Sequence, residues 1–486
     1  MKVLVIQPVP PARYFPRNEF RNMHVPTGVA YIGSALKRAG HEVRVHIREE
    51  QLHKCGINWA QADARLEDEL RTFHPDMVGL SVLTPSVEET ARIARLAKEL
   101  CGAATQVVVG GVHPTALGRE MLDNTPEIDV AVVGEGEQTM VELANGNASA
   151  ATAGILYRQN GTIAATVPRA PVANLDELAP IDYDLFDMSY YTAPSRWLVR
   201  WLKLPATNLR TSRGCTNACL FCAGHLVSGV GVRFHSVDFV VGQMQMVVER
   251  FGVRGIHFED DTLGADPNRL VKICEAVRRR GLEKRICWDG CLRVDQTSAE
   301  LLSEMKAAGC IQIEYGFESA SDRSLARIGK KTTAAMNRRA VEVTRRAGLR
   351  IYANVMIGLP GETAKELRAT CDFLRWVKPD VLSFGQMVLL PGCALFQRIP
   401  EEKRRSLDYG LYAFPMDGQG VNLTAMDDAE FARTRDRLFR YFAGPCVRRQ
   451  LLRDAGAKHE EETRGLRRSL RRFMMLHPVR YSRLPC

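Results

Sequence analysis

The sequence has no apolar run that approaches the ~20 residues needed to cross a bilayer as a helix. Its first ten residues, MKVLVIQPVP, contain one lysine and a short apolar run, which is too little for a signal peptide. The 13 cysteines are odd in number and do not have the spacing of a disulfide framework. Together these absences predict a protein of the reducing cytoplasm, with no transmembrane segment.

An excess of one charge sign is also absent from most of the 486 residues, although the net charge is +10. The excess is concentrated in Cys446–Cys486, which holds eleven Lys/Arg and four Asp/Glu, so the rest of the chain is close to neutral. A basic tail of this kind is typical of a solvated helix face. A surface for an anionic membrane or partner is the first alternative, and we expect no nucleic-acid partner.

Three cysteines lie close together in Thr211-Ser-Arg-Gly-Cys215-Thr-Asn-Ala-Cys219-Leu-Phe-Cys222, and no other cysteine follows within fifty residues. Thiolates at this C-x3-C-x2-C spacing can hold three irons of a [4Fe–4S] cluster and leave the fourth iron open to a small ligand. Zinc is the alternative, because His225 and His235 lie nearby. A disulfide framework would require a secreted chain.

The loop resembles the signature of the radical S-adenosylmethionine (SAM) superfamily, in which C-x3-C-x-aromatic-C binds the cluster. The resemblance implies that Cys215, Cys219 and Cys222 are the metal ligands, with Phe221 beside the cofactors. SAM would bind the open iron through its amino and carboxylate groups. An electron donor such as flavodoxin or ferredoxin is implied as a partner.

Residues 1 to about 145 alternate β-branched runs with helical patterns, which predicts a doubly wound parallel sheet. Such sheets bind ligands outside the carboxyl ends of their strands. No G-x-G-x-x-G follows the first strand, so a dinucleotide fingerprint is absent. Strands are expected at Val3–Ile6, Glu42–His46, Met77–Val82, Gln106–Val109 and Val130–Val133, and helices near Gly28–Arg38, Ala60–Phe73, Val87–Leu100, Ala116–Leu122 and Gln138–Leu143.

Small and polar residues follow three of these strands, in Ser81-Val-Leu83-Thr84, Gly110-Gly111-Val-His113 and Gly134-Glu135-Gly136. A Gly-Gly turn alone is more often structural, but the three segments together resemble the cobalamin-binding domain. The D-x-H-x-x-G motif, whose histidine binds cobalt, is missing, so the resemblance is to the base-off, His-off kind. It implies that Leu83 or Thr84 lies nearest the lower face of the cobalt. The implied cofactor-binding residues are Thr27, Ser81, Leu83, Thr84, Gly110, Gly111, His113, Gly134, Glu135 and Gly136.

Residues 146–205 have the character of a linker, rich in Ala, Asn and Gly at the start and loop-like later. Ile155–Arg158 and Thr162–Val167 are expected to form a hairpin through Asn160-Gly161. Trp197 and Trp201 either line a cavity between the flanking domains or, as is commoner, serve packing.

Residues 206–395 repeat a strand-helix rhythm six times, which implies a partial (β/α)6 barrel with functional groups at the carboxyl ends of its strands. Strands are expected at Asn208–Thr211, Gly255–Phe258, Arg285–Trp288, Ile311–Tyr315, Ile351–Met356 and Val381–Met387. The intervening helices are expected at Val237–Phe251, Leu270–Arg280, Ala299–Ala308, Met336–Ala347 and Ala364–Val377.

Several strand ends of this domain match the superfamily's SAM-binding segments in order and spacing. In Phe258-Glu259-Asp260-Asp261 the resemblance places Glu259 and Asp260 at the SAM amino group, with a magnesium site as the alternative. It places Glu318 and Ser319 at the ribose and carboxylate. The remaining assignments are Lys330 at the carboxylate or solvated, Arg293 at SAM or substrate, and Ile357 and Gly358 at the adenine.

Residues 396–486 contain amphipathic patterns at Asp427–Tyr441 and Arg448–Leu476, so a mainly helical region is expected. In related proteins this region helps to close the substrate cavity.

The two resemblances together imply a cobalamin-dependent radical SAM enzyme, most often a methyltransferase of an unactivated carbon in a small molecule, commonly in natural product biosynthesis. The implied cofactors are the [4Fe–4S] cluster, SAM and cobalamin, which carry the chemistry, so no catalytic residue is nominated. A non-methylating oxidative cyclisation or rearrangement is the alternative. An RNA methylthiotransferase would need three further N-terminal cysteines, whereas only Cys55 and Cys101 are present there. A non-catalytic cobalamin or redox sensor would not need the SAM-binding segments.

Overall fold

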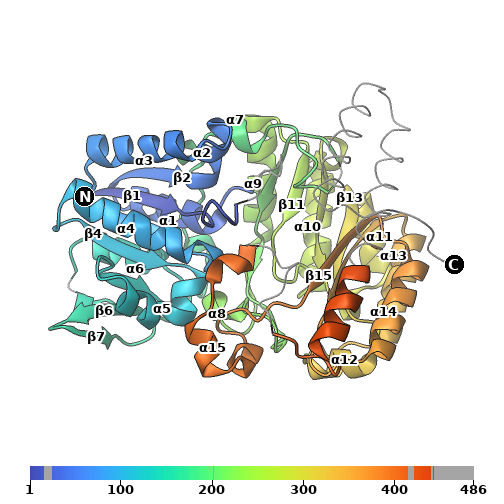
Figure 1. Ribbon diagram of the computed structural model, residues 1–486. Helices are drawn as coiled ribbons and strands as arrows, with labels where there is room; N and C mark the ends of the chain where they lie inside the picture. Colours follow the sequence, from blue (N-terminus) through green and yellow to red (C-terminus); the bar gives the residue numbers. More distant parts are fainter. Residues whose placement is uncertain (16–23, 148, 201, 414–420, 439–441, 443–486) are drawn as a thin grey trace.

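The computed structural model describes residues 1–442 except 16–23, 148, 201, 414–420 and 439–441. Two large sheets stand side by side, a mainly parallel one near the N-terminus and a wholly parallel one in the middle of the chain (Figure 1). Among the described residues, no helix is both long and apolar enough to cross a membrane.

The first sheet confirms the predicted doubly wound fold, because its first five strands are parallel in the order β2-β1-β3-β4-β5. Helices α1 and α6 pack on one face, and α3, α4 and α5 on the other. Helix α2 was not expected. The bounds are β1 Lys2–Gln7, α1 Thr27–Arg38, β2 Glu42–Ile47, α2 Arg48–Lys54, α3 Trp59–Phe73, β3 Met77–Ser81, α4 Val87–Cys101, β4 Gln106–Gly110, α5 Val112–Asn124, β5 Val130–Val132 and α6 Glu137–Ala144.

The hairpin predicted for the linker forms, but it belongs to the first sheet. Strand β6 (Ile155–Gln159) pairs antiparallel with β5, and β7 (Thr162–Ala165) pairs with β6. Asn160 and Gly161 both have positive φ, 49° and 77°, as a tight two-residue hairpin turn requires. The hairpin therefore covers an edge that β5 would otherwise leave unpaired.

The second sheet is open and wholly parallel in the order β15-β14-β13-β12-β11-β8, which confirms the partial barrel. A short ribbon of β9 (Ser212–Arg213) and β10 (Arg233–Phe234) lies beside the cysteine loop. The bounds are β8 Ala206–Leu209, α8 His225–Ser228, α9 Val237–Phe251, β11 Gly255–Phe258, α10 Pro267–Arg279, β12 Cys287–Leu292, α11 Ala299–Ala307, β13 Cys310–Glu318, α12 Asp322–Arg327, α13 Ala334–Arg346, β14 Arg350–Ile357, α14 Ala364–Val377 and β15 Val381–Gln386.

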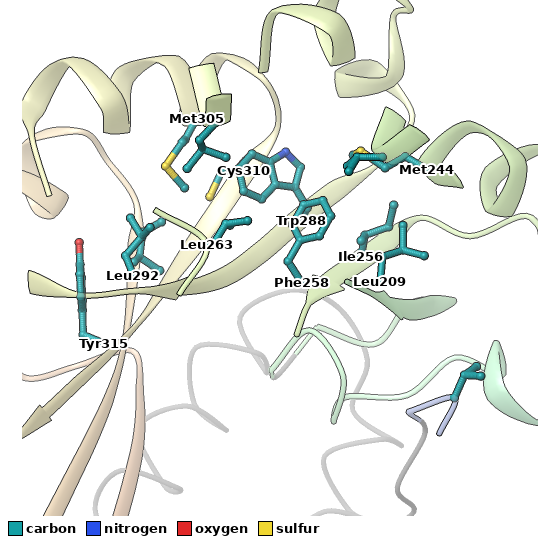
Figure 2. Close-up of a cluster of buried hydrophobic side chains, with 14 of the residues drawn as sticks. Leu209, Met244, Ile256, Phe258, Leu263, Trp288, Leu292, Met305, Cys310 and Tyr315 are labelled. Carbon is teal, nitrogen blue, oxygen red and sulfur yellow. The ribbon is translucent and has the colours of Figure 1, made fainter. Parts of the chain in front are cut away.

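The outer face of this sheet carries the apolar core under its helices. Trp288 is 1% exposed and meets Phe258 edge-to-face, with ring centroids 5.4 Å apart. Met244 of α9 and Met305 of α11 pack around them (Figure 2). The inner face is therefore left for other groups.

The chain after β15 crosses back toward the first domain. Segment η8 (Tyr409–Ala413) packs on α4, and the Tyr409 hydroxyl donates to Glu120 of α5 at 3.0 Å. Residues 428–438 are helical, in agreement with the first amphipathic pattern. The second pattern, Arg448–Leu476, lies outside the described residues, as does Trp201.

Candidate functional site

A cavity of about 640 Å³ lies where the strand ends of the first sheet face the start of the second domain. It contains most of the cofactor-binding residues that were predicted in the first domain. Thr84 and His113 do not line it. The principal lining residues are Thr27, Gly28, Ser81, Leu83, Gly110, Gly111, Gly134, Glu135, Gly136, Arg210, Arg213, Gly224, Glu259 and Asp261.

The first-domain side of the cavity fits cobalamin. Gly111 has φ +106°, and a Cβ there would lie 3.1 Å from the carbonyl oxygen of Val82, so only glycine keeps this edge flat. Leu83 is 46% exposed, which gives the cavity an apolar wall where the lower face of the cobalt is expected. The cavity continues under α1 and α6 to Val5 and Val108, which leaves room for the nucleotide tail of the corrin.

Thr84 and His113 instead support the loop that carries Leu83. Both are buried, and His113 Nδ1 lies 3.3 Å from Thr84 Oγ1. The ring of Tyr409 meets His113 edge-on at 4.9 Å. Burial lowers the pKa of His113 from 6.5 to about 4, so the imidazole is neutral in the folded protein at pH 7.

This burial predicts a pH dependence of stability. The pKa of His113 is lower in the folded than in the unfolded chain, so its contribution is present above pH 6.5 and is lost as the pH falls toward 4. The free energy of unfolding should fall by about 2 kcal/mol more between pH 7 and pH 5 in the wild type than in His113→Gln, which cannot titrate. Urea unfolding at pH 7 and pH 5 measures this difference. An equal fall in the free energy of unfolding in both proteins would contradict the prediction.

An ionic cluster joins the two domains beside the cavity. Arg213 donates to Glu135 at 3.1 Å and to Glu137 at 2.7 Å, and Arg233 donates to Glu135 at 2.7 Å. Burial favours the neutral form of Glu135, but Arg233 and Arg213 outweigh it and lower its pKa. Glu135, predicted only as a cofactor residue, therefore also fixes the first domain to the cysteine loop.

The cysteine loop lies over the carboxyl ends of the second sheet. Cys219 is buried, while Cys215 and Cys222 are partly exposed. Burial raises the pKa of the Cys222 thiol, and the Gly224 amide, which donates to its Sγ at 3.3 Å, opposes that rise. Among the described residues no three His, Cys, Asp or Glu side chains converge on one point. Cluster ligands need no such convergence, because each binds a different iron.

Two buried cations face Cys219. Burial raises the pKa of this thiol, and the charges of Lys330 and Arg293 oppose that rise. Lys330 donates to Glu318 at 2.8 Å, and Arg293 donates to the Lys330 carbonyl at 3.1 Å and also pairs with Asp295. Lys330 is 8% exposed, so the alternative of a solvated lysine is wrong. The donor set fits an anionic cluster and a carboxylate beside it.

The three adjacent carboxylates after β11 have three different environments. The Asp260 carboxylate accepts hydrogen bonds from the amide and hydroxyl of Thr211 and from the Ser212 hydroxyl. Asp260 does not line the cavity, so its position gives no support to the predicted contact with SAM. Glu259 lines the cavity and is bonded to His24 and to Asn208. Asp261 also lines it, and accepts from the Gly214 amide at 3.2 Å.

Of the remaining predicted residues, all but Phe221 of the cysteine loop lie at the ends of β13 and β14, and none lines the cavity. Glu318 has φ +59°, a conformation that is unusual for a side chain of this size. The Ser319 hydroxyl is bonded to Thr370 at 3.1 Å. Ile357 is fully buried, and Gly358 donates to Glu362, whose pKa burial raises to about 8. Phe221 packs against the apolar cluster around Leu359.

Sequence reasoning missed His24, Arg210 and Asn208. Asn208 accepts from the Val25 amide at 2.8 Å and donates to the Val25 carbonyl at 2.9 Å. This places His24 of the first domain against Glu259 of the second. None of the three belongs to a recognisable motif, and Asn208 and Val25 are separated by 183 positions, so no local signal could have found them.

Comparisons with known proteins agree with this geometry. The profile of the B12 binding domain matches residues 16–144, and that of the radical SAM superfamily matches residues 209–374. An uncharacterized methyltransferase of Pyrococcus horikoshii is 30% identical over 404 residues, which cover 82% of this chain and 83% of the relative.

Two further similarities extend the comparison. The anaerobic magnesium-protoporphyrin IX monomethyl ester cyclase of Cereibacter sphaeroides is 26% identical and matches 80% of this chain, which spans 62% of the cyclase. The solved structure of the cobalamin-dependent SAM radical enzyme OxsB, with aqua-cobalamin and SAM bound, has a TM-score of 0.71. It is 18% identical, and the match covers 98% of this chain and 71% of OxsB.

The matched domains lie on the two sides of the shared cavity, and the first relative is similar over 82% of this chain. The chain therefore belongs to the cobalamin-dependent radical SAM methyltransferase family, whose cofactors are cobalamin, a [4Fe–4S] cluster and SAM.

Proposed function

We propose that this enzyme methylates an unactivated carbon of a small molecule that binds between the two cofactor sites. The observation that carries the proposal is the shared cavity, where Leu83 and Gly111 of the first domain face Arg210, Glu259 and Asp261 of the second. A carbon that is to lose a hydrogen atom on one side and gain a methyl group on the other needs this arrangement.

The cofactors supply the radical and the methyl group, and the chain positions them. Cys215, Cys219 and Cys222 hold the cluster. Lys330 and Arg293 balance its charge and that of a SAM carboxylate. The glycines at 111 and 134 admit the corrin, and the ionic cluster around Arg213 keeps the two sites at a fixed separation. A protein electron donor such as flavodoxin or ferredoxin, a cytoplasmic location and a role in natural product biosynthesis belong to the same proposal.

Product analysis tests the reaction. Anaerobic turnover with SAM deuterated at the methyl group should give equal amounts of S-adenosylhomocysteine, 5′-deoxyadenosine and a product that carries the label. The similarity to the cyclase makes a non-methylating oxidation the second candidate. Formation of 5′-deoxyadenosine with an unlabelled, oxidised product and no S-adenosylhomocysteine would establish that candidate instead.

Leu83 predicts the state of the lower face of cobalamin. Since a leucine side chain has no donor atom, the EPR spectrum of cob(II)alamin bound to the wild type should show no nitrogen superhyperfine splitting. Leu83→His should introduce the splitting, whereas the control Leu83→Met should not. Splitting in the wild type would show that a nitrogen, from another residue or from the cofactor's own base, binds the cobalt.

A further inference from the structure

The inner face of the second sheet carries polar side chains. Successive residues of a strand point to opposite faces, and Ile256, Trp288 and Ile313 belong to the core under the helices. Their neighbours therefore point inward, toward the open side of the partial barrel. These inward residues include His257 of β11, Asp289 of β12, Gln312 and Glu314 of β13, and Asn354 of β14.

One charged pair on this face is balanced internally. His257 Nδ1 lies 2.9 Å from Asp289 Oδ1, and Gln312 donates to the other carboxylate oxygen at 2.8 Å. Burial disfavours the imidazolium, but Asp289, Glu314 and Glu259 raise the pKa of His257 to about 9. Asp289 and His257 thus neutralise each other at pH 7.

Glu314 has no such partner. Asn354 Nδ2 donates to it at 2.7 Å, and in the described part of the chain no Lys, Arg or His nitrogen lies within 4.0 Å of its carboxylate. Two arginines approach this side of the sheet: Arg200 lies over the ring of Tyr352 at 5.8 Å, and Arg350 of β14 stands opposite Gln312 in the strand register. A partly buried carboxylate without a counter-ion is costly unless a ligand supplies the charge.

Gln312 gives an independent indication of a missing donor. It is fully buried, and its Oε1 has no hydrogen-bond partner among the described residues. Buried polar atoms are normally satisfied, so this acceptor, two positions from Glu314 on the same face, requires an N–H or O–H group. Among the described residues, Glu314 therefore lacks a paired cation and Gln312 Oε1 lacks a donor.

The linker closes the amino end of the inner face. A Cβ on Gly255 would meet Leu204 and lie 3.1 Å from Val199, and both Val199 and Leu198 are at most 2% exposed. Of these floor residues, only Leu204 keeps part of its apolar surface exposed. The walls stay partly exposed at His257, Glu314 and Asn354, below the strand ends that carry the cysteine loop.

We infer that the substrate is a hydrophilic small molecule with a protonated amine or guanidinium, and that Glu314 binds this cation on the inner face of the sheet. The identification of this ligand as the substrate rests on the proposed function, whereas the binding of a cation at Glu314 does not. The polar walls disfavour a lipid, because its hydrocarbon chain needs apolar contacts.

A substrate-free measurement tests the unpaired charge. In the full-length protein with its cofactors, Glu314→Gln should raise the midpoint of thermal unfolding by about 2 °C or more, with or without SAM. The matched control, Glu342→Gln on the exposed face of α13, should leave the midpoint unchanged. A lower or unchanged midpoint for Glu314→Gln would show that the carboxylate is already satisfied, and would overturn the inference.

Binding of matched probes tests the ligand class. Agmatine, tyramine and tryptamine, each with its N-acetyl derivative, are titrated anaerobically into the holoenzyme. At least one amine should bind about ten-fold more tightly than its neutral derivative, and the preference should disappear in Glu314→Gln. Equal binding within every pair, or no binding by any amine, would overturn the inference. Charge-dependent binding without methyl transfer would instead contradict only the proposed function.

Discussion

Replacement of Cys219 by alanine is expected to remove the cluster and, with it, all cleavage of SAM. Cys219 is the buried ligand of the three and faces Lys330 and Arg293, so no water or neighbouring cysteine can take its place. Iron should fall from about four atoms per chain to less than one, and 5′-deoxyadenosine should fall to the level of a control without enzyme. Cobalamin content should be unchanged, because the corrin site lies across the cavity.

Cys55→Ala is the matched control for this experiment. Cys55 is partly exposed at the end of α2, outside the loop, and its replacement should retain both iron and activity. Full iron content in the Cys219 variant would show that the loop does not hold the cluster in the proposed way.

Arg213→Met should produce the largest loss of stability. Arg213 is 8% exposed and pairs with two buried carboxylates, so its removal leaves Glu135 and Glu137 without their shared cation. Breaking a buried ion pair from one side costs about 3–5 kcal/mol. Denaturant unfolding of the full chain at pH 7 measures the loss. Arg346→Met, a change at a largely exposed arginine, should cost less than about 0.5 kcal/mol.

The same ionic cluster gives this experiment a pH signature. Arg233 and Arg213 hold the pKa of Glu135 below its ordinary value of 4.5. The stability that Glu135 contributes is therefore complete above that value and is lost as the pH falls through the lower folded one. The difference in the free energy of unfolding between wild type and Arg213→Met should become smaller below pH 4.5. A difference that does not change with pH would show that packing against Tyr31, not charge, accounts for the loss.

Both sheets could be predicted from the sequence because each strand is a short β-branched run followed by a helical period. Predicted and observed bounds agree within a few residues, as at Val237–Phe251. The placement of β6 and β7 could not be predicted, because it depends on the free edge of β5 and not on the hairpin itself. Nothing local distinguishes a hairpin in a linker from one that joins a sheet.

The site was predictable where one motif lies on one loop and unpredictable where two domains meet. The glycines that follow β4 and β5 line the cavity because strand ends of a parallel sheet share an edge. The choice between Leu83 and Thr84 depends on a turn in which Thr84 is directed to His113. Asp260 and Glu259 are neighbours in the sequence, so their local sequence is the same. The orientation of Asp260 is set by its hydrogen bond from the Thr211 amide, which the spacing of residues does not predict.

The aromatic segment between the domains has a consequence for protein engineering. Tyr183, Tyr190 and Tyr191 are at most 8% exposed and belong to one core with Val5 of the first sheet and Ile256 of the second. The two domains are therefore not independent modules joined by a tether. A chimera that exchanges the cobalamin domain with that of a relative at residue 145 would leave behind half of a core built for the original sheet. Exchanges that carry residues 1–191 together, and keep Arg213 and Arg233 matched to Glu135, have the better prospect of folding.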